Sequence, residues 1–330
     1  MLWEFNMNYI NRLLICKLGW KARSEFSTRD HLLNYINWWG NNDAEKIWFS
    51  IFLRNNLKIR RKINFFSVFG GKANYINRRC QREKDAINIF YTPENISLTG
   101  VNKNNRSYAN YMSFLVDLSL GFDYVNDNPR YLRFPYWLIS LFSPTSTYED
   151  VKQIVTAVNS KCIKYDERFI DCSMICSHDT TGTRARICDS LTTLFDIKYE
   201  GGWRSNSNIL KDKFNNNKIK YLNKVKFNVC PENSNQYGYV TEKLFEAFFA
   251  GAIPIYWGGD ASPELDIINE SSFIYWDGSD RCYETIERLN NNKNDYIDFV
   301  SQPVFKVGAE EKIWKYFQYL KDKVDFLQEK

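Results

Sequence analysis

Short apolar runs alternate with segments of helical pattern along most of the chain, and this alternation limits the possible folds more than any other feature. We expect strands at 35–40, 58–69, 86–91, 118–122, 169–176, 224–230 and 252–257. We expect helices at 43–53, 151–160, 184–195, 242–250 and 310–328. Strands that alternate with helices at these lengths predict parallel sheets with helical crossovers.

The length of 330 residues favours about two domains. A loop-like segment at 143–147 separates two halves that show the same alternation. We therefore predict an α/β fold with two Rossmann-like domains facing a cleft. The predicted ranges are 1–30 for an N-terminal extension, 31–155 for the first domain, and 156–330 for the second domain with a C-terminal helix.

Composition narrows the classes of function. Hydrophobic residues make up 44% of the chain and charged residues 25%, which excludes a disordered or fibrous protein. The net charge of +5 is too weak to indicate nucleic-acid binding, and it suits an anionic small ligand or peripheral contact with an anionic membrane surface. The aromatic share of 17% indicates either a large core or a site that stacks on flat ligands such as sugars and bases.

The eight cysteines are scattered, so we expect free thiols in a reducing compartment rather than a disulfide scaffold. Cys172, Cys176 and His178 match no standard zinc spacing, and we expect no metal site. No stretch reaches the ~18 apolar residues that span a bilayer, and the start of the chain lacks the apolar core of a signal peptide. These features predict a cytoplasmic protein with no transmembrane segment and at most peripheral membrane contact.

The segment 226–260 carries the strongest chemical signal, because it predicts a strand, a loop, a buried helix and a returning strand. Thr241 is expected to be the N-cap of the helix, with its hydroxyl accepting a backbone hydrogen bond. Lys243 in the first turn is disfavoured by the helix dipole unless an anion binds there, so the segment suits a phosphate cradle. A solvated Lys243 at the helix start is the alternative that the spacing leaves open.

Three motifs stand close together in this segment: Glu232-Asn233-Ser234, Tyr239-Val240-Thr241-Glu242-Lys243 and Ala250-Gly251-Ala252-Ile253-Pro254. The combination resembles the C-terminal donor-binding motif of the α-1,3/4-fucosyltransferases. The chain departs from that family at Cys230-Pro231, where an aromatic residue usually precedes the first motif. Further similarity at 35–40, 91–95, 121–123, 130–135 and 177–184 extends the resemblance over residues 35–260.

The resemblance implies a GT-B type glycosyltransferase that transfers L-fucose from GDP-β-L-fucose, with inversion, to a hydroxyl of an N-acetyllactosamine-type glycan. It implies Glu94 as the catalytic base in an acceptor-binding first domain. It implies donor binding by the second domain through the following residues: Arg184, Asn233, Tyr239, Glu242 and Lys243. The sequence has no compelling Asp-x-Asp pair, so we expect the fixed cations to replace a metal and no cofactor to be required.

Several alternatives stay open at this level. Arg186 is the alternative to Arg184, and we expect it to be solvated. Trp38 and Trp39 either stack on an acceptor sugar or pack in the core. An inverting enzyme with another nucleotide sugar is an alternative because of Cys230-Pro231, and a non-catalytic glycan- or nucleotide-binding relative is a further one.

Overall fold

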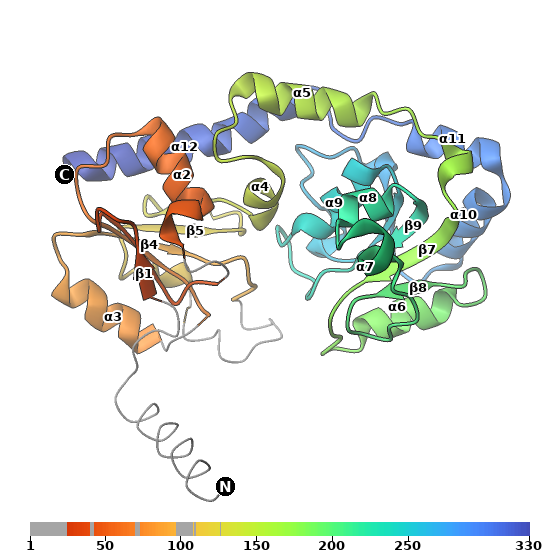
Figure 1. The fold of residues 1–330 in the computed structure, drawn as a ribbon, viewed down its shortest axis with the longest axis horizontal. Coiled ribbons are helices and arrows are strands. Elements are labelled where there is room, and N and C mark those ends of the chain that lie inside the picture. The colour runs from red at the N-terminus through yellow and green to blue at the C-terminus, as the bar shows by residue number, and fades with distance from the viewer. Residues whose placement is uncertain (1–24, 40–42, 70–72, 97–107, 109, 126) are drawn as a thin grey trace, which may run out of the picture. The chain divides into compact units, whose positions relative to one another are not determined.

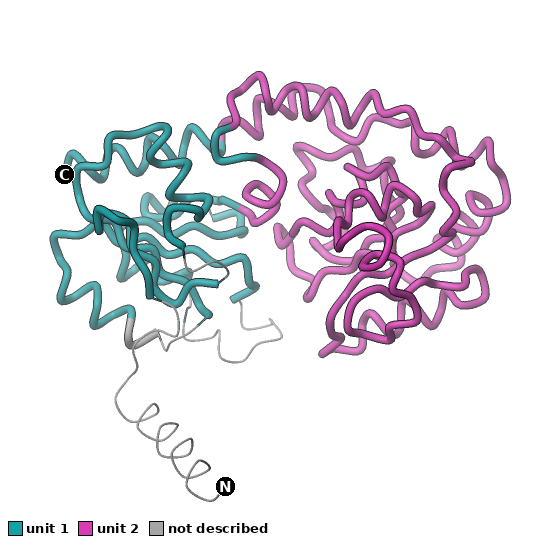
Figure 2. The backbone as a smooth tube through the Cα atoms, viewed as in Figure 1, with its two compact units in different colours: residues 1–134, 143–145, 316–330 teal, residues 135–142, 146–315 magenta. Residues whose placement is uncertain are grey.

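The structure is a computed structural model that describes residues 25–39, 43–69, 73–96, 108, 110–125 and 127–330. It divides into two compact units, coloured separately in Figure 2. The first comprises the described residues up to Phe134, with Ser143–Thr145 and Tyr316–Lys330. The second comprises Pro135–Phe142 and Ser146–Lys315. Residues 1–24 of the predicted N-terminal extension lie outside the described residues.

The first unit is built on a six-stranded sheet in the order β1-β2-β3-β4-β5-β6, in which only the β1–β2 pair is antiparallel. Its strands are Glu25–Ser27, Leu33–Ile36, Ile63–Phe66, Ile87–Tyr91, Leu118–Gly121 and Tyr131–Arg133. Every residue of β2 to β5 is buried, as expected for parallel strands covered on both faces. Before β4 the described residues form the helical elements η1 (Ala44–Lys46), α2 (Trp48–Asn56) and α3 (Ala73–Arg82).

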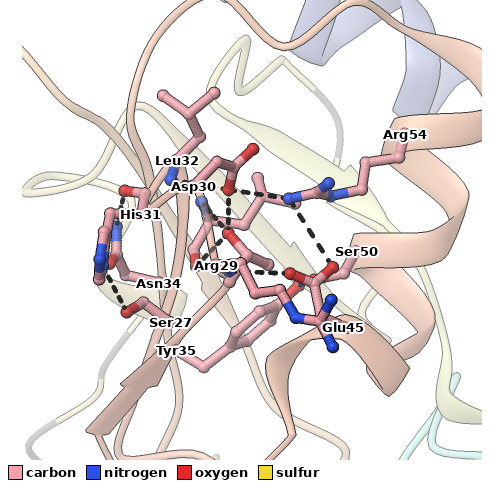
Figure 3. A network of polar contacts seen from close by, with 12 residues as sticks. Ser27, Arg29, Asp30, His31, Leu32, Asn34, Tyr35, Glu45, Ser50 and Arg54 are labelled. Atoms are coloured by element: carbon pink, nitrogen blue, oxygen red, sulfur yellow. Dashed lines mark hydrogen bonds and ion pairs between the residues drawn. The ribbon is translucent and has the colours of Figure 1, made fainter.

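Polar contacts tie the β1–β2 connection to the first helices, as Figure 3 shows. Asp30 Oδ1 accepts hydrogen bonds from Arg54 Nη2 at 2.8 Å and from Thr28 Oγ1 at 2.5 Å. The backbone N–H of Arg29 donates to Glu45 Oε1 at 2.8 Å. Residues 25–30 are therefore part of the first unit, and the predicted extension ends earlier than residue 30.

The C-terminal helix α12 (Ala309–Glu329) is the main departure from the predicted domain ranges. From Tyr316 onward the helix groups with the first unit, where Phe317 packs on Trp48 with ring centroids 5.8 Å apart. Figure 1 shows this part of α12 beside α2. Gln328 Oε1 also accepts a hydrogen bond from the backbone N–H of Arg60 at 2.8 Å. The range 156–330 is therefore not one unit, because the apolar face of the last helical turns is buried by the first sheet's helices.

The second unit has an all-parallel five-stranded sheet in the order β11-β10-β9-β7-β8. The strands are Ile170–Ile175 (β7), Lys198–Glu200 (β8), Val225–Val229 (β9), Ile253–Tyr256 (β10) and Ile274–Tyr275 (β11). From β7 the chain adds β8 on one side of the sheet, and from β9 it adds β10 and β11 on the other side. The point between β7 and β9 is thus the topological switch point, where open parallel sheets bind ligands at the strands' carboxyl ends.

Helices cover both faces of this sheet (Figure 1). One face packs on α6 (Thr183–Leu191), α10 (Asp280–Asn291) and α11 (Lys293–Val300). On the other face, Ser173 Oγ of β7 lies 2.8 Å from Tyr221 OH of α8 (Lys218–Leu222), which packs with α7 (Ile209–Phe214) and α9 (Glu242–Ala250). Helices α4 (Tyr136–Leu141) and α5 (Tyr148–Asn159) also belong to this unit, and Trp137 of α4 stacks on Phe245 of α9 at 4.6 Å.

The predicted fold of two Rossmann-like parallel sheets is confirmed, whereas the predicted cleft between the two domains stays a prediction.

The end of α9 is specified by a glycine in the sequence. Gly251 adopts a left-handed conformation with φ of 71° and caps the helix. This positive φ is a conformation that residues with a Cβ atom rarely adopt, so the backbone favours glycine at the end of the helix.

Candidate functional site

A buried glutamate organises the site at the carboxyl end of β9. The side chain of Glu232 is 0% exposed, and its oxygens accept hydrogen bonds from Thr241 N–H at 2.7 Å, Thr241 Oγ1 at 2.7 Å and Lys243 Nζ at 3.0 Å. Its backbone N–H donates to Trp257 O at 2.8 Å. Glu232 thus links the end of the strand, the following loop and the first turn of α9.

Thr241 occupies the N-cap position as predicted, but its expected capping role is wrong. Its side chain makes no hydrogen bond to the first-turn amides of α9. The hydroxyl donates to Glu232 instead and accepts from Lys243 Nζ at 2.7 Å. The hydrogen bond that the hydroxyl donates to the charged carboxylate is stronger than one it would accept from a backbone amide. The side chain therefore turns towards Glu232 and away from the helix start.

Lys243 is a fixed cation rather than a solvated side chain, so the open alternative for this residue is excluded. Burial lowers the pKa of Lys243, but its ion pairs with Glu232 and with Glu242 (3.9 Å) outweigh burial and raise the pKa overall. The ammonium therefore stays charged across the physiological pH range. Its position in the first turn of α9 adds the positive end of the helix dipole to this charge.

Arg184 supplies the second cation from the first turn of α6. It is 6% exposed, donates through Nη1 to the carbonyl oxygen of His178, and through Nη2 to Asn233 Oδ1 at 2.7 Å. The Asn233 contact joins the β7–α6 connection to the loop after β9. Arg186 is exposed and donates to Thr183 Oγ1 at 3.1 Å, in line with its predicted solvation.

A pocket at the switch point brings three of the predicted donor-binding residues together: Arg184, Glu242 and Lys243. Its other lining residues come from β7, α8, α9 and the end of β9: Met174, Ile175, Lys218, Leu222, Asn228, Val229, Cys230, Pro231 and Glu246. Burial raises the pKa of Glu242, but the ammonium groups of Lys243 and Lys218, together with hydrogen bonds to the carboxylate, outweigh burial and lower the pKa overall. The predicted residues therefore give the pocket two cations and a carboxylate, and Lys218 and Glu246 add a third cation and a second carboxylate.

Asn233 and Tyr239 lie in the β9–α9 loop but do not line this pocket. Asn233 reaches the site through its hydrogen bond to Arg184. Tyr239 is buried, and its backbone N–H donates to Gln236 O at 3.0 Å within the loop. The structure thus places Asn233 next to the cation it orients, and Tyr239 in the supporting loop.

Three predicted residues belong to the first unit. Glu94 follows the carboxyl end of β4, is half-buried, and donates its backbone N–H to Thr92 Oγ1 at 3.1 Å. Trp38 is only 4% exposed and packs on Tyr35 at 5.0 Å, so it belongs to the aromatic core. Trp39 is half-buried and stacks on Trp38 at 4.5 Å, which leaves Trp39 as the better candidate for contact with a sugar.

Sequence reasoning missed four residues of the second-unit site: Lys218, Asn228, Glu232 and Glu246. Glu232 stood in the recognised motif, but nothing in the sequence indicated that its side chain would be buried. Lys218 and Glu246 are separated along the chain, yet Lys218 Nζ lies 3.0 Å from Glu246 Oε2. No local pattern predicts such a pair. Among the residues that the structure describes, no group of His, Cys, Asp and Glu could hold a metal ion.

A parallel α/β unit with two cations at helix starts beside a switch point is suited to binding the phosphate groups of a nucleotide. Two family models match the chain. Residues 33–140 match the model for the α-(1,3)-fucosyltransferase FucT N-terminal domain, and residues 167–318 match glycosyltransferase family 10 (fucosyltransferase), C-terminal part. The chain belongs to glycosyltransferase family 10, the fucosyltransferases.

A curated relative is the α-(1,3)-fucosyltransferase FucT of Helicobacter pylori, which is 27% identical over 301 residues covering 80% of this chain. The matched region spans only 58% of that relative's length. Crystal structures of an α1,3-fucosyltransferase match the fold at 23% identity over 87% of this chain and 89% of theirs. The TM-score is 0.59 for one of them and 0.56 for the complexes with GDP and with GDP-fucose.

Proposed function

We propose that the protein is an α-1,3-fucosyltransferase that transfers L-fucose from GDP-β-L-fucose, with inversion, to a hydroxyl of an N-acetyllactosamine-type glycan. The observation that carries the proposal is the pair of cations, Arg184 and Lys243, at the starts of α6 and α9 beside the switch point. Family membership and the GDP-fucose that a structural relative binds support the choice of donor.

The proposed donor site follows from the charges of the second unit. Arg184 and Lys243 neutralise the diphosphate, and the guanidinium offers two parallel hydrogen bonds where the ammonium offers a point charge. Asn233 orients Arg184 through their 2.7 Å hydrogen bond. Glu242, held ionised by Lys243, accepts hydrogen bonds from the ribose hydroxyls. Tyr239 supports the loop that carries these groups.

Glu94 is the proposed catalytic base, and the first unit is the proposed acceptor-binding domain. In a single inverting step the acceptor hydroxyl attacks the anomeric carbon, the bond from that carbon to the β-phosphate oxygen breaks, and GDP leaves. A carboxylate takes the hydroxyl proton as the attack proceeds. Glu94 has a suitable place at the carboxyl end of β4, where parallel sheets present functional groups. Trp39 is the proposed stacking surface for the acceptor sugar.

The reaction is proposed to need no metal, because two fixed cations already stabilise the charge that develops on the leaving diphosphate. The test is the initial rate of transfer with and without a chelator such as EDTA. Equal rates are expected, and a loss of activity that Mg²⁺ or Mn²⁺ restores would contradict this point.

We also propose a cytoplasmic location with at most peripheral membrane contact. The cysteines among the described residues are all free thiols, and most of them are buried, which suits a reducing compartment. No helix in the described part of the chain is long and apolar enough to cross a bilayer. Cell fractionation with a salt wash tests the proposal, because peripheral contact with anionic lipids is released by salt.

The decisive experiment mixes the protein with GDP-fucose and N-acetyllactosamine, follows GDP release, and determines the product linkage by NMR. An α-1,3-linked fucose is expected. A second candidate donor is kept because Cys230 and Pro231, which replace the usual aromatic residue, line the pocket itself. A thermal-shift screen of nucleotide sugars distinguishes GDP-fucose from another donor by the rise in unfolding temperature that each causes. A rise with a sugar nucleotide that lacks guanine, and none with GDP-fucose, would contradict the proposal.

A further inference from the structure

The pocket continues past the two cations to a second polar end that the proposed roles do not use. Glu246 lies one helical turn after Glu242 on α9, so the two carboxylates share a face of the helix. Lys218 at the start of α8 donates from Nζ to both oxygens of Glu246, at 3.1 and 3.0 Å. All three residues line the pocket.

Asn228 adds an independent observation at this end of the pocket. It is 5% exposed, and its Oδ1 has no hydrogen-bond partner among the residues that the structure describes. Its neighbour on β7 is Ser173, whose hydroxyl is 2.8 Å from Tyr221 OH on α8, so this face of the sheet points towards α8 and α9. A buried acceptor without a donor is costly, and a pocket-lining one indicates a ligand that supplies an N–H or O–H.

The order of groups along the pocket suggests which part of a nucleotide reaches this end. The cations at the helix starts suit the diphosphate, and Glu242 suits the ribose. Glu246 then lies one turn further along α9, where the base would follow the ribose. The base must therefore offer hydrogen-bond donors to a carboxylate and to an amide oxygen.

We propose, resting on the proposed function, that Glu246 and Asn228 select guanine as the base of the donor nucleotide. Guanine presents three N–H bonds side by side: one on N1 and two on the 2-amino group. The carboxylate of Glu246 accepts from N1 and from one amino hydrogen, and Asn228 Oδ1 accepts from the other. Lys218 is a positioning residue that orients Glu246 through its hydrogen bonds to both carboxylate oxygens.

The same acceptors disfavour the other common bases. Uracil has a single N–H between two carbonyl oxygens, and these oxygens would face the carboxylate. Adenine offers one amino group beside an unprotonated ring nitrogen. A site built to accept several hydrogen bonds rejects a ligand that leaves its buried groups unpaired.

The test compares dissociation constants for GDP and IDP by isothermal titration calorimetry, because IDP differs from GDP only by lacking the 2-amino group. The wild-type protein should bind GDP about tenfold or more tightly than IDP, as expected for loss of a hydrogen bond to a charged group. Glu246→Gln and Asn228→Leu should each weaken GDP binding by about tenfold and IDP binding less. The GDP to IDP preference should therefore fall towards one.

Glu287→Gln and Lys220→Gln are matched controls, because both positions are exposed and lie outside the pocket. Both should keep the wild-type preference. Thermal unfolding checks each variant, and if Asn228→Leu does not fold, Glu246→Gln decides alone.

The outcomes separate this inference from the proposed function. A wild-type protein that transfers fucose and binds GDP, with a GDP to IDP preference unchanged in Glu246→Gln, overturns the role of this end of the pocket and leaves the proposed function standing. A wild-type protein that binds no GDP overturns both.

Discussion

The carboxyl edges of the two sheets carry different chemistry, although both sheets are parallel and both edges hold predicted site residues. In the second unit the edge is made of charges fixed by partners, with Arg184 bound to Asn233 and Lys243 bound to Glu232. In the first unit the edge carries aromatic rings, with Trp39 stacked on Trp38, and Glu94 beyond the end of β4.

The difference teaches what each kind of ligand requires. A diphosphate is held best by charges that are in place before it binds, and the proposed diphosphate site is a network of paired side chains with the buried Glu232 at its centre. A neutral sugar is held by flat apolar surfaces and a few polar groups, and the proposed acceptor site in the first unit lies next to an aromatic core. The following predictions test this contrast, beginning with the largest effect.

Glu94→Gln is expected to lower the transfer rate by about a thousandfold, because the amide cannot take the acceptor proton. The dissociation constant for GDP should stay within about twofold of the wild type, since the charges proposed to bind the diphosphate belong to the second unit. Steady-state kinetics and calorimetry on the same preparation measure both quantities. Glu329→Gln, an exposed change in the same unit, is the control. Retained turnover in Glu94→Gln would remove Glu94 from the mechanism.

Lys243→Met is expected to damage both binding and stability. GDP affinity should fall by about a hundredfold with the loss of a charged hydrogen bond. The free energy of unfolding should fall by about 3–5 kcal/mol, because the buried carboxylate of Glu232 loses its counter-ion. Calorimetry and urea denaturation measure the two effects, and Lys211→Met, at an exposed position of α7, is the control.

The double variant Lys243→Met with Glu232→Gln sharpens this prediction. Removing the uncompensated charge should restore part of the stability without restoring GDP binding. If the double variant recovered GDP affinity as well, Lys243 would not be a direct ligand of the diphosphate.

Trp38→Ala and Trp39→Ala should have different effects, because we expect Trp38 to stabilise the core of the first unit and Trp39 to contact the acceptor. Trp38 is almost wholly buried, so its truncation should cost about 3–5 kcal/mol of unfolding free energy. Trp39 is half-buried, and its truncation should cost less stability while raising the KM for the acceptor several-fold. Denaturant unfolding and acceptor titrations distinguish them. An unchanged acceptor KM in Trp39→Ala would place this tryptophan outside the acceptor site.

The smallest expected effect is a shift in the pH dependence of GDP binding in Lys218→Met. Burial raises the pKa of Glu246 above its ordinary value of 4.5, and Glu242 adds to this while Lys218 and Lys243 oppose it. The buried Cys230 thiol at the end of β9 is the other titratable neighbour. Only the ionised carboxylate accepts from both guanine N–H groups, so GDP affinity should decrease as the pH falls through this pKa.

Without Lys218 the pKa of Glu246 rises further, and the decrease should begin at a higher pH than in the wild type. Calorimetry over a pH series measures the shift, with Lys220→Met as the control. Coincident profiles for Lys218→Met and the wild type would show that Lys218 does not hold Glu246 ionised.

The sequence by itself determined the parallel α/β architecture and the strand–helix–strand segment around α9. The predicted strand 224–230, helix 242–250 and strand 252–257 correspond to β9 (Val225–Val229), α9 (Glu242–Ala250) and β10 (Ile253–Tyr256). These elements are specified by local apolar patterns and by end signals such as Gly251, which act over a few residues. The placement of Arg184 and Lys243 at helix starts follows from the same local signals.

Only the tertiary structure decided how the side chains pair and which unit buries them. The ion pair of Lys218 with Glu246, the burial of Glu232, the place of Trp38 in the core and the grouping of residues 316–330 with the first unit all depend on contacts between distant segments. Such contacts are set by how complete elements pack, and the residues that make them carry no local pattern. The charges of the site were therefore readable from the sequence, whereas the network that holds them in place was not.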